Sequence, residues 1–397
     1  MTIIVGIDVA KRNHEASFVD SSGAMLGKSY SFPNSHSGMN QLLVQLEKRN
    51  PKGLPVVFGM EATGHYWLGL YSHLLEKGYT VHVINPIQSD SLRNFYIRQT
   101  KTDVIDSFII AEAIRFGRFA ATLRAEPDLI ALRQLCRYRF SLVDAVADLK
   151  RKVITIVDQV FPEYEKLFSD MFGKSSKEML SSFSIPEEFL AIDVEQLAKQ
   201  LQETSRGRFG IAKAEEIQDA ARQSFGIKVA TDALTFELRQ LMDRLAFSEK
   251  QLADLEEQIM KYYDRFPCTL HTITGVGKIM AAVILSEIGD ISRFSAPAKL
   301  VAFAGIDPSI KQSGQFQGTQ SHMSKRGSAY LRRAVWLVAF PASRFDPVFA
   351  AFYQKKRSEG KAHGTALGAV ARKLLYTIFA LLNSGQEYVP QVLAAHS

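Results

Sequence analysis

Cysteine and long apolar runs are both scarce in this sequence. The two cysteines, Cys136 and Cys268, lie far apart, which excludes a disulfide framework and a cysteine-based metal site and suggests a reducing cytosol. We expect both to be small buried hydrophobic residues. No apolar run reaches the ~18 residues of a membrane span, so we expect a soluble, cytoplasmic protein that does not bind a membrane.

Acidic residues are missing from one long stretch near the C-terminus. The formal net charge is +7, and residues 266–397 hold 15 Lys and Arg against 6 Asp and Glu. Between Pro308 and Phe345 every charged residue is basic, which predicts binding of a polyanion such as nucleic acid, with an ordinary solvated face as the alternative. The predicted phosphate-binding residues are Lys325, Arg326, Arg332 and Arg333.

The first part of the chain alternates between apolar strands and amphipathic helices. The order βββαβαβα is that of the ribonuclease H fold, in which the first and fourth strands lie side by side at the centre of the sheet. The expected elements are a strand at 2–8, a hairpin of 14–20 and 24–32, a helix at 37–48 behind Ser35, a strand at 54–61, a helix at 66–77, a strand at 79–84 and a helix from 103 to about 117.

Four carboxylates fall at the ends of these elements. Asp8 and Glu61 each end an apolar strand, and Asp103 and Asp106 open a helix at a spacing that puts both on one helix face. Carboxylate oxygens brought together in this way suit Mg²⁺. A pair of such ions about 4 Å apart is a common device for cutting and joining phosphodiesters.

Two long helices are expected in the middle of the chain. One runs from Pro127 to Phe161, and the other begins at Thr231 and Asp232, which are good N-cap residues. Leucines of the second helix step by alternating four and three residues, which favours a coiled coil with the first helix or another subunit. An ordinary core helix is the alternative. Residues 165–230 between them are polar and weakly patterned.

Glycine-rich turns mark the C-terminal part. Residues 274–278 (TGVGK) precede an apolar helix and are similar to a helix-hairpin-helix, whose glycine turn approaches a DNA phosphate. Ser313 precedes Gly314 in a basic segment, as a nucleophile for a phosphodiester would, although a plain loop role is also open.

Taken together, five motifs carry a resemblance that spans nearly the whole chain. They are GIDVAK, EATGHY, KTDVID, AGIDP with QSG, and SKRG with LRR. The chain resembles the DEDD transposases of the insertion sequence one-ten family, which are relatives of the Piv DNA invertase.

This resemblance implies a composite enzyme. Residues 1–125 would be a RuvC-like α/β domain of ribonuclease H fold, 126–266 a helical coiled-coil insertion, and 267–397 a mainly α C-terminal transposase domain. The tetrad Asp8, Glu61, Asp103 and Asp106 would hold Mg²⁺, while Ser313 attacks DNA to form a phosphoserine link. Ser309 and Ser321 are fallback nucleophiles. A structured noncoding guide RNA and a homo-oligomer, either a dimer or a tetramer, are also implied.

Three other readings compete with this one. An actin-like ATPase or sugar kinase also starts with Gly-Ile-Asp and a hairpin, but the C-terminal half lacks the second glycine-rich phosphate loop with an Asp that it needs, and Asp103 and Asp106 would be unexplained. A RuvC-like junction nuclease would use the tetrad without a serine nucleophile. A DNA-bridging protein with an inactive tetrad is disfavoured because all four carboxylates are present.

Overall fold

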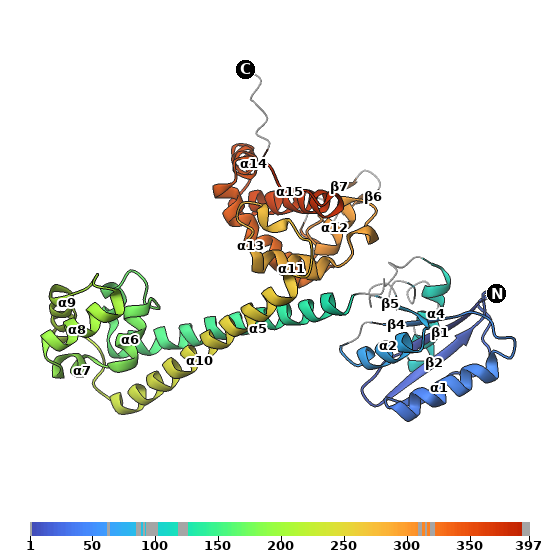
Figure 1. Ribbon diagram of the computed structural model, residues 1–397, viewed down its shortest axis with the longest axis horizontal. Helices are drawn as coiled ribbons and strands as arrows, with labels where there is room; N and C mark the ends of the chain where they lie inside the picture. The colour runs from blue at the N-terminus through green and yellow to red at the C-terminus, as the bar shows by residue number, and fades with distance from the viewer. Residues whose placement is uncertain are drawn as a thin grey trace, which may run out of the picture. The chain divides into compact units, whose positions relative to one another are not determined.

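The computed structural model describes residues 2–61, 64–84, 89, 92, 102–117, 126–308, 312–313, 316–317 and 322–390, and of 312–313 and 316–317 the backbone alone. The chain divides into two compact units, residues 1–125 and 126–397, which are described separately below. Figure 1 labels the elements of both.

The first unit is a mixed α/β domain with a five-stranded sheet in the order β3-β2-β1-β4-β5. β1 pairs antiparallel with β2 and parallel with β4, and β4 pairs parallel with β5. The predicted order of strands and helices is therefore confirmed for the described residues. The elements are β1 (Ile3–Asp8), β2 (Asn13–Val19), β3 (Tyr30–Pro33), α1 (His36–Arg49), β4 (Val56–Glu61), α2 (Trp67–Glu76), β5 (Thr80–Ile84) and α4 (Asp103–Arg115).

The second strand of the hairpin is shorter than predicted. β3 covers only residues 30–33, and Met25 makes a single bridge to Val19. Gly23 and Gly27 have φ values of +94° and +95°, so the backbone turns at both positions. The predicted helix after Ser35 is confirmed, because the Ser35 side chain accepts a hydrogen bond from the Gly38 N–H and caps α1.

Each face of the sheet is covered by helices. Side chains alternate between the two faces of a strand, and those of Ile3, Val5 and Ile7 pack in one core with α1 and α2. The opposite face carries Ile4 and Gly6 and packs against α4. This second face is the one toward which alternation also directs residue 8.

Glycine permits α4 to lie directly on the central strands. A Cβ at Gly6 would stand 2.2 Å from the carbonyl oxygen of Ser107, and a Cβ at Gly59 would stand 2.4 Å from Ile114. At Gly6 the close atoms are helix backbone, so no side chain fits there without moving α4, whereas a side chain at Gly59 would displace the Ile114 side chain. The hydroxyls of Ser17 and Ser107 share a hydrogen bond of 2.7 Å across the same interface.

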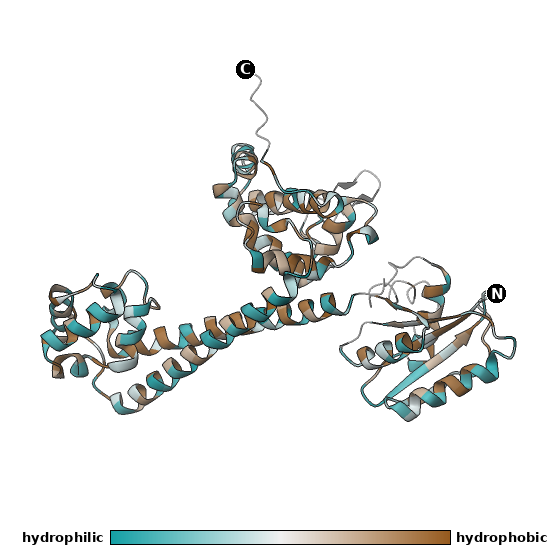
Figure 2. Cartoon of the chain, in the orientation of Figure 1, coloured by the Kyte–Doolittle hydropathy of each residue, from teal (hydrophilic) through white to brown (hydrophobic). Residues whose placement is uncertain are grey.

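The second unit is built on two long antiparallel helices, α5 (Pro127–Val160) and α10 (Thr231–Tyr263), which pack side by side (Figure 1). Arg139 pairs with Glu256 at 2.6 Å. Lys150 pairs with Glu249 at 3.3 Å, so the partners run in opposite directions. Figure 2 shows hydrophilic and hydrophobic residues alternating along both helices, as expected when one face of each is buried.

The leucine seam of α10 faces this partner. Leu238, Leu241 and Leu245 are buried, as is Leu255 further along. Of the two partners considered for this seam, the structure shows packing against α5 of the same chain. The predicted N-cap is wrong: Ala230 caps the helix with φ +57° and without a side-chain hydrogen bond, so Thr231 is already helical.

Residues 161–222 fold into short helices with their own core. Tyr164, Phe161 and Phe189 are fully buried there. They pack with the C-terminal half of α5 and the N-terminal half of α10. The helices are too short to show a long apolar period, which explains their weak pattern in the sequence. They are η1 (Pro162–Leu167), α6 (Lys174–Ser182), α7 (Pro186–Ala191), α8 (Val194–Ser205) and α9 (Ile211–Arg222).

The C-terminal helices form a further core with the N-terminal half of α5 and the C-terminal half of α10. Both cysteines are free and buried in this core, as predicted. Its elements are η2 (Leu270–Thr272), α11 (Lys278–Ile288), η3 (Ile291–Arg293), α12 (Pro297–Ala304), β6 (Gln312–Ser313), β7 (Phe316–Gln317), α13 (Ala329–Phe345), α14 (Pro347–Ser358) and α15 (His363–Ser384).

One helix is more apolar than expected. By length and composition α15 could cross a membrane, although Arg372 and Lys373 interrupt its apolar run. Its buried residues, including Leu367, Leu374 and Leu381, instead belong to the core shared with α12, α13 and α14. We therefore interpret α15 as a core helix.

The glycine turn before α11 has a structural reason within the protein. Gly275 has φ +90°, and a Cβ there would lie 2.9 Å from the Ala342 nitrogen of α13. Glycine is thus needed for packing, whether or not this turn also meets a phosphate.

Candidate active site

Asp8 and Glu61 lie at the same edge of the sheet. They are the last residues of β1 and β4, which are parallel and paired up to Ile7 and Met60. Alternation along both strands directs the two carboxylates to the face that α4 covers. Two neighbouring strands thus present acidic side chains at one point, as the sequence predicts.

The first turn of α4 supplies the other two carboxylates. The Thr102 hydroxyl accepts a hydrogen bond from the Ile105 N–H and starts the helix, so Asp103 and Asp106 fall in its first turn. A helix N-terminus carries partial positive charge, which stabilises carboxylates there. Asp106 is only 8% exposed and lies on the face of α4 that packs on the sheet.

The charges of the four carboxylates interact, as the pKa of Asp8 shows. Burial is the largest cause of a rise in the pKa of Asp8, from 3.8 to about 6. The negative charges of Asp106, Asp103 and Glu61 raise that pKa further, in this order. All three carboxylates are therefore close enough to Asp8 to interact with it.

A serine that the sequence analysis missed joins the site. The Ser89 hydroxyl donates a hydrogen bond of 2.6 Å to Oε2 of Glu61. Ser89 follows β5 and is buried, so it holds one oxygen of Glu61 in place. No motif in the sequence marks this residue, because the contact joins positions 28 residues apart.

The donor set suits a divalent cation. No group of three or more His, Cys, Asp or Glu side chains in the described part of the chain is already arranged around a metal position. The negative charges of Asp106, Asp103 and Glu61 act on Asp8, and rotation about the side-chain bonds of the four carboxylates can bring their oxygens together. Oxygen-only ligands on a site with excess negative charge are what Mg²⁺ prefers, so the residues fit this ion.

The predicted nucleophile lies in the second unit. Ser313 is in β6 and pairs with Phe316 of β7, and an isolated bridge joins Pro308 to Met323 at the base of this segment. The backbone of Ser313 is thus part of a short hairpin. The fallback serines Ser309 and Ser321 lie outside the described residues.

The four predicted phosphate-binding residues differ in their surroundings. Lys325 and Arg326 are exposed, and Arg332 donates to the Ala304 carbonyl at 3.2 Å. Arg333 makes two hydrogen bonds to the Asp144 carboxylate of α5, one of 2.7 Å. No local pattern in the sequence relates Arg333 to this acid, because the two residues lie 189 positions apart.

Comparisons with known proteins relate most of the chain to one family of enzymes. A family model of DEDD transposases of the IS110 type matches residues 5–162, and a second model, of the IS116/IS110/IS902 transposase family, matches residues 268–354. The chain is 25% identical to the 43.6 kDa protein of insertion element IS110 from Streptomyces coelicolor, over 97% of this chain and 95% of that protein.

Two further relatives match over the same length. The 44.8 kDa protein of insertion element IS116 from Streptomyces clavuligerus is 24% identical, over 98% of this chain and 96% of that protein. The pilin gene-inverting protein of Moraxella bovis is 23% identical, over 97% of both chains. The chain belongs to the IS110 family of transposases, enzymes that cut and rejoin DNA.

Proposed function

We propose that this transposase moves an insertion sequence by cutting and rejoining DNA at a Mg²⁺-binding site made by Asp8, Glu61, Asp103 and Asp106. The observation that carries the proposal is that these carboxylates lie at the ends of β1 and β4 and in the first turn of α4, where Asp106, Asp103 and Glu61 each raise the pKa of Asp8. Residues 1–125 are then a RuvC-like catalytic domain of ribonuclease H type, an assignment supported by the strand order and by α4 covering the central strands.

The four acids are held by two kinds of element, the central strands and a helix. Asp8 and Glu61 are anchored by the central strands, and Asp103 and Asp106 by the first turn of α4. Bound Mg²⁺ would polarise a phosphodiester and help to deprotonate the attacking hydroxyl. The hydrogen bond from Ser89 fixes the Glu61 carboxylate before the ion binds. Binding would therefore cost less side-chain entropy at this ligand.

Ser313 is the proposed nucleophile. Its oxygen would attack the phosphorus of a DNA phosphodiester, forming a phosphoserine link and releasing the other side of the cut strand as a free hydroxyl. Support comes from the basic segment around it and from its place in a short hairpin. Activation of an alcohol at neutral pH needs a base or metal, so the carboxylates and the serine must meet around the DNA.

The remaining domains would serve binding and assembly. We propose that residues 126–266 form a coiled-coil insertion, which the antiparallel packing of α5 on α10 supports. Residues 267–397, with their basic excess, are then the C-terminal transposase domain that binds DNA and a structured noncoding guide RNA. A homo-oligomer, in the cytoplasm, would bring catalytic and serine-bearing units together.

Recombination with a donor plasmid that carries the parent insertion sequence tests the tetrad. We expect Asp103→Asn to abolish strand exchange and Glu47→Gln to leave it unchanged, because Glu47 is an exposed acid of α1 away from the site. Full activity of the Asp103→Asn protein would overturn the assignment of the tetrad.

A second experiment tests the serine. Denaturing gels of the reaction should show a covalent protein–DNA adduct for the wild type and none for Ser313→Ala. Peptide mapping that placed the adduct on Ser309 or Ser321 would correct the residue. Cleavage by the alanine protein without any adduct would instead establish a metal-dependent junction nuclease that acts without a serine nucleophile.

A further inference from the structure

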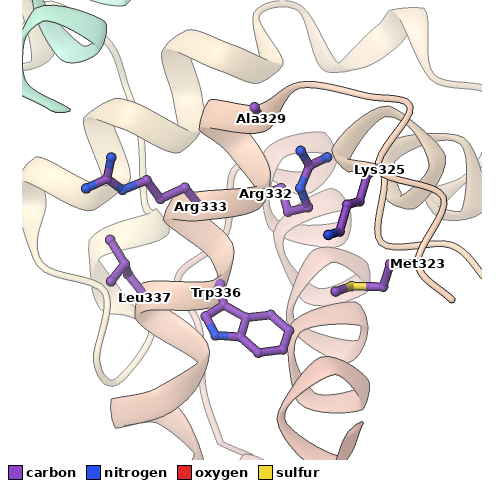
Figure 3. Close-up of a pocket in the computed structure, with 7 residues that line it drawn as sticks. All are labelled: Met323, Lys325, Ala329, Arg332, Arg333, Trp336 and Leu337. Atoms are coloured by element: carbon purple, nitrogen blue, oxygen red, sulfur yellow. The ribbon is translucent and has the colours of Figure 1, made fainter. Parts of the chain in front are cut away.

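A pocket beside the segment that carries Ser313 has the composition of a nucleotide site. Its volume is about 250 Å³. This is below the ~300–1,000 Å³ of pockets for larger ligands, so it suits a single planar base. Figure 3 shows its lining: Met323, Lys325, Ala329, Arg332, Arg333, Trp336 and Leu337. We refer to it as the Trp336 pocket.

The aromatic wall of the pocket is anchored from behind. Trp336 is half-buried and packs against the core of the C-terminal helices. A Cβ at Gly368 of α15 would lie 3.5 Å from Cζ3 of the indole, in ordinary van der Waals contact, so α15 packs against this edge of the ring. One edge of the indole is therefore fixed by the core, while the ring also lines the pocket.

The rim of the pocket is held rigidly. Lys325 has φ +52°, in the left-handed region that residues with a Cβ rarely adopt, and its N–H donates to the Gly305 carbonyl at 3.1 Å. A Cβ at Gly327 would overlap the Phe303 carbonyl at 1.8 Å, so this stretch lies directly on the end of α12. A left-handed backbone conformation at a lysine costs free energy and persists only when the surrounding contacts impose it. Such strained residues are frequent at binding sites.

The charged groups around the pocket have separate roles. The Arg333 guanidinium pairs with Asp144 and lies 4.6 Å from the centre of the Phe140 ring. Figure 3 shows Arg332 and Lys325 together on the other side of α13 from Arg333. None of the described lining residues is acidic, so an anion meets no repulsion from the wall.

The position of the pocket relates it to the proposed chemistry. Met323 lines it and also forms the bridge to Pro308, so the pocket wall is continuous with the base of the segment that holds Ser313. An aromatic face combined with cations is the usual way in which proteins hold single-stranded nucleic acid. We infer that the Trp336 pocket holds one unpaired nucleotide of the DNA, its base against the Trp336 indole and its phosphate between Lys325 and Arg332.

This inference rests on the proposed function, and tryptophan fluorescence tests it. The chain has two tryptophans, so a Trp67→Phe protein reports on Trp336 alone. Single-stranded DNA should quench this signal, because a stacked base quenches indole emission, and blunt duplex DNA should quench it much less. Quenching by single-stranded RNA but not by DNA would overturn the DNA assignment.

Substitutions supply the energetic test. Loss of one stacked base predicts an affinity for single-stranded DNA about 5- to 150-fold weaker in Trp336→Ala. Trp336→Phe should retain most of the affinity. Phe345→Ala, which removes an exposed aromatic ring from the same helix, should leave it unchanged. Thermal melting of each protein separates loss of the pocket from loss of the fold.

A measurement on the wild-type chain avoids substitution altogether. Photocrosslinking with 5-iododeoxyuridine in single-stranded DNA should modify Trp336 or Met323. If the wild type binds DNA and recombines it, yet neither crosslinks there nor loses affinity in Trp336→Ala, this inference fails and the proposed function stands. If the wild type binds no DNA, both fail.

Discussion

Replacing Asp8 with Asn should stabilise the metal-free protein while removing its activity. Burial and three neighbouring carboxylates raise the pKa of Asp8 from 3.8 to about 6, so the ionised form destabilises the fold at neutral pH. A rise of about two units corresponds to roughly 3 kcal/mol. Asp8 is only partly buried, and solvent screening reduces this to between about 1 and 3 kcal/mol.

The sign of the effect sets its pH dependence. The native protein binds the Asp8 proton more tightly than the unfolded chain does, so the free energy of unfolding of the metal-free wild type should fall as the pH rises from about 4 through 6. Asp8→Asn should lack this contribution. Urea unfolding in EDTA at pH 5 and pH 7.5, for both proteins, measures the difference.

Adding Mg²⁺ should reverse the order of stability. The ion removes the repulsion in the wild type, and binding at 100 times Kd contributes about 2.7 kcal/mol. The variant has lost a ligand and should gain much less. An Asp8→Asn protein that is less stable than the wild type in EDTA, together with a wild type that does not respond to Mg²⁺, would refute this reasoning.

Three other predictions concern stability and binding. Gly6→Ala should lower the melting temperature markedly, because its Cβ would overlap the Ser107 carbonyl of α4; a melting temperature equal to that of the wild type would contradict the packing of α4 on β1. Leu245→Ala, which empties a fully buried position between α5 and α10, should cost about 2–5 kcal/mol in urea unfolding, whereas Phe247→Ala at an exposed position of the same helix should cost less than about 0.5 kcal/mol. Asp144→Ala should change the free energy of unfolding by less than about 1 kcal/mol, because its ion pair with Arg333 is exposed. The same substitution should tighten DNA binding in filter-binding assays, because it frees Arg333. Weaker binding would show that the ion pair instead orders the site.

Features that depend on local order could be predicted from the sequence. The strands before Asp8 and Glu61 are short apolar runs ending at an acid, and the i, i+3 spacing of Asp103 and Asp106 puts them on one helix face. The seam of α10 was visible because 33 consecutive helical residues repeat it several times. In each case the signal lies within one element.

Features that depend on contacts between distant residues could not be predicted. The bond from Ser89 to Glu61 and the ion pair of Arg333 with Asp144 join residues that no local pattern relates. The Trp336 pocket combines a helix face with a strained rim. Single positions such as these carry no periodicity, so only the folded chain shows them.

Anomalous scattering from crystals soaked in Mn²⁺ tests the tetrad most directly, because Mn²⁺ takes oxygen ligands as Mg²⁺ does. We predict a strong difference peak among the carboxylates of Asp8, Glu61, Asp103 and Asp106 in the wild type, and its loss in Asp8→Asn. A wild-type map without a peak there, from crystals of a protein that still recombines DNA, would contradict the central proposal.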